Sequence, residues 1–212
     1  MNRLIAVVTS ITLMACSVGV AHAAEKYLFY VHGSGVKDTN DPKVKAYEII
    51  VQELKNSGFN VAFELRTTEV GDSDAHAHEY AAKIADQVRA LLAKGTAPED
   101  ITVAGYSLGS MTTMVASGLI ANPKVNFVFL AGCPVNSAVK VTIDYTRIKG
   151  HVLSITDTKD DRFGSCNGRL PQDVSYKEVV LNSGEGHAVF RLTDEKYIKL
   201  WKEPLVAWTQ GK

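Results

Sequence analysis

The chain has 212 residues, of which 46% are apolar and 22% charged, a composition typical of a globular protein with a sizeable core. Its 23 basic and 23 acidic side chains give a net charge of zero at pH 7. This balance provides no electrostatic reason to expect a nucleic acid or an anionic membrane as a partner.

Residues 1–23 have the layout of a secretory signal peptide. One positive charge, Arg3, precedes an apolar run, and Ala21 to Ala23 form an A-x-A cleavage site. We expect residues 24–212 to form one domain, in which 22 basic and 23 acidic side chains leave a net charge of −1.

Two alternatives to a cleaved leader remain open. A transmembrane anchor needs about 20 apolar residues, and four hydroxyl side chains dilute this run. The stretch from Leu13 to Cys16 is similar to a bacterial lipobox, which would leave a lipidated Cys16, although Met14 fits that pattern poorly. We therefore expect export to the periplasm or the medium without a transmembrane span, with lipid anchoring at Cys16 as the alternative.

The first elements alternate between strand and helix patterns. Residues 27–31 predict a strand, which is followed at once by the segment from His32 to Gly35. Asp41-Pro42 then opens an amphipathic helix that Gly58 ends. Residues 59–65 predict the second strand.

The middle of the chain continues this alternation. Residues 72–94 predict the second helix, and residues 101–104 the third strand. The segment from Gly105 to Gly109 turns sharply out of that strand into a helix that reaches about Ala121.

Three more strands and a closing helix follow. Residues 125–131, 151–156 and 175–181 predict strands, and residues 194–202 a helix that Pro204 breaks or restarts. The alternation indicates βαβ units, hence an α/β fold with a mostly parallel sheet of about six strands and helices on both faces.

The strongest chemical signal is a G-x-S-x-G pentapeptide, Gly105 to Gly109, between a predicted strand and a predicted helix. A serine on such a turn, here Ser107, has a strained backbone, and the flanking glycines let strand and helix approach without a Cβ clash. The hydroxyl then stands at the carboxyl end of the sheet, above a helix N-terminus. Outside this context, a serine before a helix is usually only an N-cap.

One of the six histidines is a candidate general base. His187 lies in a Gly-rich segment after the last predicted strand, from which it can reach the serine. His76 and His78 are two residues apart on a helix and point to different faces, so we expect solvated surface and no metal site. His151 begins a strand and is expected to be structural.

These motifs resemble the α/β-hydrolase family, most closely its small, lidless esterases and lipases. Ser107 matches the family's nucleophile, His187 its catalytic histidine, and His32-Gly33 its HG motif, although that dipeptide alone would indicate only a turn. The resemblance implies that the backbone N–H groups of Ser34 and Leu108 form an oxyanion hole. It also implies a three-layer fold, here without a cap domain, over nearly the whole mature chain.

The resemblance also places the catalytic acid, because the family's acid follows the strand before the histidine segment. That strand is followed here by three carboxylates. Asp160 lies at the matching position, Asp157 is the second candidate and Asp161 the third. At least one of them is expected to be only part of a solvated turn.

Two cysteines, Cys133 and Cys166, remain beyond Cys16. In an oxidising compartment they predict a disulfide, and their spacing matches no zinc signature. Two separate buried thiols are the alternative. If the fourth and fifth strands are neighbours, a bridge would clamp the acid loop. Residues 132–149 have no firm secondary-structure signal and are expected to form a loop near the site.

Together these residues predict an exported serine hydrolase that cleaves small-molecule or lipid carboxylic esters through an acyl-enzyme, without a cofactor. Thioesterase, amidase and acyltransferase activities remain open, because the same residues serve them and the pocket is not readable from sequence. A non-catalytic exported binding protein of the same fold also remains open, as does the oligomeric state.

Overall fold

The computed structural model describes residues 25–68, 72–135 and 141–211. The predicted leader, residues 1–23, and the alternative lipid site at Cys16 lie outside these residues. Across the described ranges, no helix is long and apolar enough to span a bilayer.

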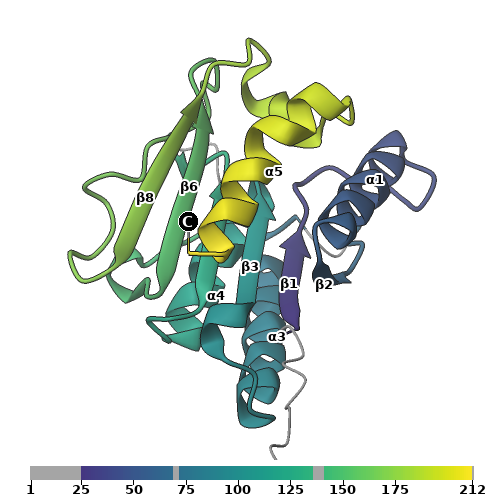
Figure 1. The fold of residues 1–212 in the computed structure, drawn as a ribbon. Coiled ribbons are helices and arrows are strands. Elements are labelled where there is room, and N and C mark those ends of the chain that lie inside the picture. Colours follow the sequence, from purple (N-terminus) through teal and green to yellow (C-terminus); the bar gives the residue numbers. More distant parts are fainter. Residues whose placement is uncertain (1–24, 69–71, 136–140, 212) are drawn as a thin grey trace, which may run out of the picture.

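A six-stranded sheet forms the centre of the fold (Figure 1). Its order is β2-β1-β3-β4-β6-β8, and every neighbouring pair is parallel, as predicted. Strand ends agree with the predicted ones to within two residues, and both ends of β8 coincide with the prediction. The strands are β1 (Lys26–Val31), β2 (Phe59–Phe63), β3 (Ile101–Tyr106), β4 (Asn126–Leu130), β6 (His151–Asp157) and β8 (Ser175–Leu181).

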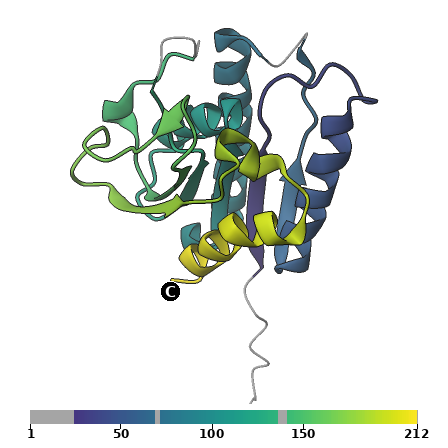
Figure 2. The ribbon, with the colours of Figure 1, turned by 90° about the horizontal axis from the view of Figure 1, so that it is seen from above.

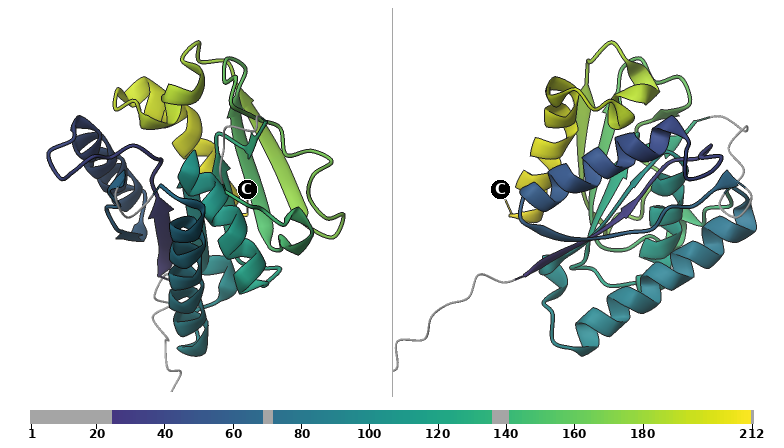
Figure 3. Two further views of the ribbon diagram at one scale, coloured as in Figure 1. Left: turned by 180° about the vertical axis from the view of Figure 1, so that it is seen from behind. Right: turned by 90° about the vertical axis from the view of Figure 1, so that its right-hand side faces the viewer.

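Helices cover both faces of this sheet, which gives the predicted three-layer α/β fold (Figure 3). Helices α1 (Pro42–Asn56) and α5 (Glu195–Thr209) pack on one face. Helices α3 (Asp74–Ala93) and α4 (Leu108–Ile120) pack on the other. The central strands β3 and β4 are buried along their whole length, because helices exclude water from both of their faces.

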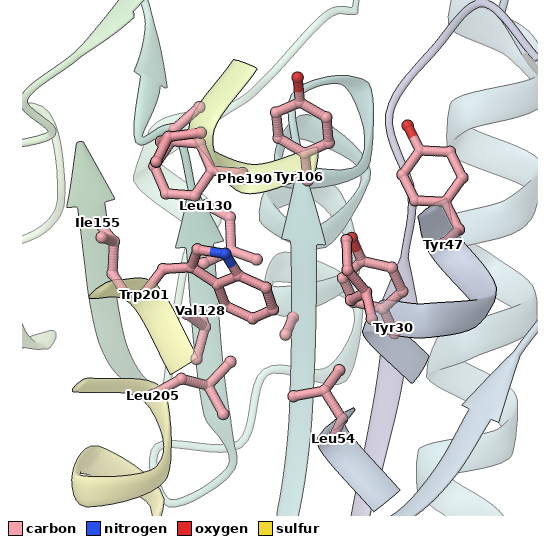
Figure 4. Packing of buried hydrophobic residues seen from close by; sticks show 14 of the residues in the cluster. Tyr30, Tyr47, Leu54, Tyr106, Val128, Leu130, Ile155, Phe190, Trp201 and Leu205 are labelled. Atoms are coloured by element: carbon pink, nitrogen blue, oxygen red, sulfur yellow. The ribbon is translucent and has the colours of Figure 1, made fainter. Parts of the chain in front are cut away.

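The core beneath α1 and α5 is built from large side chains (Figure 4). Trp201 and Leu205 of α5 and Leu54 of α1 are fully buried against strand residues such as Val128 and Tyr30. Fully burying side chains of this size contributes roughly 1.5–3 kcal/mol each. This packing holds α1 and α5 in fixed positions against one face of the sheet.

Helix α5 corrects one expectation, because it continues through Pro204 to Thr209 instead of breaking or restarting there. Proline removes one N–H donor and crowds the carbonyl four residues earlier, here that of Leu200. Trp201 and Leu205 are buried on either side of the proline. Their tertiary packing stabilises the helix more than the proline destabilises it.

A small antiparallel pair, β5 (Cys133–Pro134) and β7 (Phe163–Gly164), lies beside the main sheet. Strand β5 lies at the start of the segment 132–149, which had no secondary-structure signal, and a short 3-10 helix, Tyr145–Arg147, lies farther along that segment. Strands β4 and β6 are neighbours, and a disulfide joins Cys133 to Cys166. The predicted bridge is therefore present, and it ties the segment after β6 to the end of β4.

Replacing Cys133 and Cys166 together with alanine should lower the free energy of unfolding by about 3 to 4 kcal/mol, because the bridge closes a loop between residues 33 apart. Urea denaturation of the oxidised proteins measures this difference. Reductant should destabilise the wild type and leave the double variant unchanged. Equal midpoints for oxidised wild type and variant would contradict the prediction.

Candidate active site

Four segments meet at the carboxyl edge of the sheet, where ligand sites of parallel α/β folds form. They follow β1, β3, β6 and β8. Figure 2 looks down onto this edge, with the blue segment after β1 and the green segments after β6 on opposite sides. Residues far apart in sequence are thereby brought around a single point.

Ser107 stands at that point, on the corner between β3 and α4. Its backbone has φ 59° and ψ −117°, a conformation that strains any residue with a Cβ. A Cβ on Gly105 would lie 2.0 Å from the carbonyl oxygen of Gly109, and one on Gly109 would lie 1.9 Å from that of Val31. Only glycine fits at both positions, so this corner requires the two glycines of the pentapeptide.

The structure brings Ser107, His187 and Asp160 together. The Ser107 hydroxyl lies 2.8 Å from His187 Nε2, and His187 Nδ1 lies 2.6 Å from Asp160 Oδ2. The Asp160 side chain is fully buried, and that of His187 is 13% exposed. The carboxylate accepts a hydrogen bond from Nδ1–H, which leaves Nε2 as an acceptor for the serine hydroxyl.

Two aromatic rings hold the imidazole of His187. Tyr106 lies 5.1 Å and Phe163 5.0 Å from it, centroid to centroid. The Tyr106 hydroxyl also donates to the His187 carbonyl oxygen at 3.0 Å. Neither ring is predicted from the sequence. Tyr106 is a variable position of the pentapeptide, and Phe163 lies just beyond the acidic turn, so neither carries a signal of its own.

The three candidate acids occupy different environments. Only Asp160 contacts His187, and its other oxygen accepts from the backbone N–H groups of Arg162 and Phe163 at 3.0 and 3.1 Å. Asp161 is exposed. The geometry therefore brings the first-ranked carboxylate to the imidazole.

Asp157 has a structural position between two loops. Its carboxylate accepts from the Lys159 backbone at 2.9 Å and from the Ser183 backbone and hydroxyl at 2.9 and 2.6 Å. Burial acts to raise the pKa of Asp157, but these hydrogen bonds outweigh it and the pKa is lowered. The ionised carboxylate thus fastens the loop that carries Asp160 to the loop that carries His187.

His32 is buried and shapes the loop after β1. Its Nδ1 lies 2.7 Å from the Gly33 carbonyl, and its Nε2 accepts from the Arg66 backbone N–H at 2.8 Å. Burial and the nearby Arg66 charge lower the pKa of His32 to about 4. The imidazole is therefore neutral at pH 7 and acts as a structural hydrogen-bonding group.

The two N–H groups expected in the oxyanion hole flank Ser107. Leu108 follows it at the start of α4, and a Cβ on Gly33 would lie 3.2 Å from the Ser107 Cβ, so the loop with Ser34 passes close by. Within the described ranges, neither the Ser34 nor the Leu108 backbone N–H donates to another residue. Their role as oxyanion donors stays a prediction.

A pocket of about 390 Å³ opens beside Ser107 and His187. Its walls include Ser34 from the loop after β1 and Tyr47 from α1. Three cationic side chains also line it, Lys43, Arg162 and Arg191, which the sequence reasoning did not identify. They come from three distant segments, so only the tertiary structure shows them as a group.

The other histidines lie away from this pocket. His78 is exposed near Asp74 and the Thr142 carbonyl, and His151 stacks on Trp208 at 3.6 Å. Among the described residues, no three His, Cys, Asp or Glu side chains cluster in a way that could hold a metal ion.

No protein-family model and no curated protein sequence matches this chain. Solved structures do: Arabidopsis thaliana SOBER1 aligns with a TM-score of 0.52 at 16% identity, over 89% of this chain and 99% of that one. A Klebsiella pneumoniae protein provisionally named a dienelactone hydrolase gives 0.59 at 14% identity, over 91% and 90%. A phospholipase/carboxylesterase from Dyadobacter fermentans gives 0.52 at 14%, over 86% and 90%. The chain has the α/β-hydrolase fold, and at these identities the likeness shows the fold alone.

His32 should make the protein less stable in mild acid. Its folded pKa, about 4, is below the ordinary value of 6.5, so below pH 6.5 the unfolded chain binds a proton that the folded protein does not. The free energy of unfolding should fall by about 2 kcal/mol from pH 7 to pH 5 through this group.

Urea denaturation at several pH values between 7 and 5 measures this change. The variant His32→Gln, which does not titrate, should show a shallower pH dependence in the same window. If the free energy of unfolding changes with pH equally in wild type and variant, the lowered pKa of His32 in the folded protein is contradicted.

Proposed function

We propose that this protein is a serine hydrolase that cleaves carboxylic esters through an acyl-enzyme. The observation that carries the proposal is the hydrogen-bonded series from the Ser107 hydroxyl through His187 to Asp160, on a strained corner beside a pocket. Nucleophile, base and orienting acid are the three groups that acyl transfer needs.

In the first step, the Ser107 oxygen attacks the ester carbonyl carbon while His187 Nε2 takes the hydroxyl proton. The buried Asp160 carboxylate holds the imidazole and stabilises the imidazolium that forms. His187 then gives the proton to the leaving alcohol oxygen as the carbon–oxygen bond of the ester breaks. The alcohol leaves, and the acyl group stays on Ser107.

Water completes the reaction by the same route. His187 takes a proton from a water molecule as the water oxygen attacks the acyl carbon. It gives that proton to the Ser107 oxygen when the acyl-enzyme bond breaks. The products are the free acid and the regenerated enzyme. The atoms and protons of the two steps balance without a cofactor.

The negative oxygen of each tetrahedral intermediate would accept from the backbone N–H groups of Ser34 and Leu108. Leu108 begins helix α4, whose N-terminus adds a favourable partial charge at the same point. A well-placed donor of this kind lowers the barrier by roughly 3 kcal/mol. Both donors are backbone groups, which hold their positions throughout the reaction.

Thioesters, amides and acyl transfer to another alcohol use the same groups and are tested as alternative substrates or acceptors. An ester is favoured because two of the similar structures carry the names dienelactone hydrolase and phospholipase/carboxylesterase. A non-catalytic binding protein is less favoured, since binding alone does not require a strained serine aligned with a buried Asp–His pair.

Replacing Ser107 with alanine should lower kcat for a short p-nitrophenyl ester by at least about 10³-fold, because the nucleophile is lost. A fluorophosphonate probe should label the wild type at Ser107 and leave the variant unlabelled, as read by mass spectrometry. Retained activity, or labelling at another residue, would overturn the proposal.

The acid is tested by a matched pair of variants. Asp160→Asn should lower kcat by roughly 10²- to 10⁴-fold, because the imidazole loses its orienting carboxylate. Asp161→Asn removes the adjacent exposed carboxylate and should stay within about twofold of wild type. Equal effects of the two substitutions would reject Asp160 as the acid.

A further inference from the structure

Three cationic side chains converge on the pocket beside Ser107 from separate elements. Lys43 lies in the first turn of α1, Arg162 in the segment between β6 and β7, and Arg191 at the end of the 3-10 helix Gly186–Arg191. Among the residues that the structure describes, no Asp or Glu lines this pocket. The wall beside the proposed nucleophile therefore carries three positive charges.

None of these cations forms an ion pair within 4.0 Å of a carboxylate in the part of the chain that the structure describes. Elsewhere on the surface, lysines pair with acids, as in Lys202 with Glu53. Carboxylates that lie close to the pocket are engaged in hydrogen bonds. Asp41 accepts from the backbone N–H groups of Lys37 and Lys43 at 3.0 and 2.9 Å. Asp160 binds His187, and Asp72 accepts from the Gly35 backbone N–H at 2.8 Å.

The remaining lining adds neutral polar groups. Tyr47 and Tyr106 lie on the wall, and their hydroxyls point toward the carboxyl edge of the sheet in Figure 4. Burial raises the pKa of Tyr106 to about 12 in spite of the nearby Arg191 and Arg162, so this hydroxyl stays neutral. A neutral hydroxyl therefore supplies no negative charge to offset the three cations.

The pocket is also a poor site for an uncharged alkyl chain. Among the described lining residues, only Ala188 has an aliphatic side chain, and that side chain is a single methyl group. The others are polar, charged or glycine. Like charges that face a common hollow repel one another, and a bound anion would relieve that repulsion while it gains charge-assisted hydrogen bonds.

We propose that the ester cleaved at Ser107 carries an anionic group, a carboxylate or a phosphate, that Lys43, Arg162 and Arg191 bind. This inference rests on the proposed function and specifies its substrate class. Arginine presents paired N–H donors that match either oxyanion, and lysine adds a compact positive charge. Binding of the anion would hold the ester carbonyl in place beside the serine oxygen.

Matched esters test the preference. On the acyl side, mono-p-nitrophenyl adipate, which carries a free carboxylate, is compared with methyl p-nitrophenyl adipate, in which that carboxylate is a methyl ester. On the alcohol side, 4-acetoxybenzoate is compared with its methyl ester, and 4-acetoxyphenyl phosphate with 4-acetoxyanisole. Each kcat/KM is divided by the rate constant for alkaline hydrolysis of the same ester. We expect the charged member to be favoured by about tenfold or more in at least one pair, and the preference to weaken in 0.5 M NaCl.

Single variants connect that preference to the pocket. Lys43→Gln, Arg162→Gln and Arg191→Gln should each lower the charged-to-neutral ratio of kcat/KM, by about five- to thirtyfold for at least two of them. Lys94→Gln, at the end of α3 on the opposite edge of the sheet, removes an equal charge and should leave the ratio unchanged. Circular dichroism verifies that each variant is folded.

The outcomes separate this inference from the proposed function. Ser107-dependent hydrolysis of neutral esters with no preference for any charged partner, or a preference that all three pocket variants retain, overturns the anion inference and leaves the hydrolase standing. Absence of Ser107-dependent hydrolysis of every ester overturns both. The pair with the largest ratio distinguishes a carboxylate from a phosphate.

Discussion

The close contact between β3 and α4 is the constraint on which the candidate site depends. Gly105 and Gly109 allow backbone approaches that a Cβ would prevent, and the resulting corner holds Ser107 at φ 59°. Strain of this kind persists only where the surrounding structure fixes it. Here the Ser107 N–H donates to the Leu130 carbonyl, and the fully buried strands β3 and β4 keep the corner in place.

The partners of the serine come from loops that would otherwise be free to move. The disulfide ties the segment after β6 to the end of β4, and Asp157 fastens that segment to the loop after β8. The Asp160 and His187 segments are thereby fixed to each other, and two aromatic rings fix the imidazole. Preorganisation of this kind keeps proton transfer within hydrogen-bonding distance.

Catalytic chemistry and substrate choice would be assigned to different residues. Ser107, His187 and Asp160 are suited to acyl transfer of many kinds, whereas under our proposal the pocket cations would restrict the substrates to anionic esters. The chain as a whole is electrically neutral, so the positive pocket is a local feature set against acidic groups elsewhere. Local charge of this kind can concentrate an anionic substrate at the serine without making the whole protein basic.

The sequence by itself determined the parallel α/β architecture and the corner at Ser107, because hydrophobic periodicity and a glycine-flanked serine are local features. The resemblance to a known family ranked Asp160 above Asp157 and Asp161, and the two cysteines predicted a disulfide, with free thiols as the alternative. Tertiary structure decided which carboxylate meets the imidazole, whether α5 passes Pro204, and that Lys43, Arg162 and Arg191 share one wall. These outcomes depend on packing between residues distant in the chain, which no local pattern encodes.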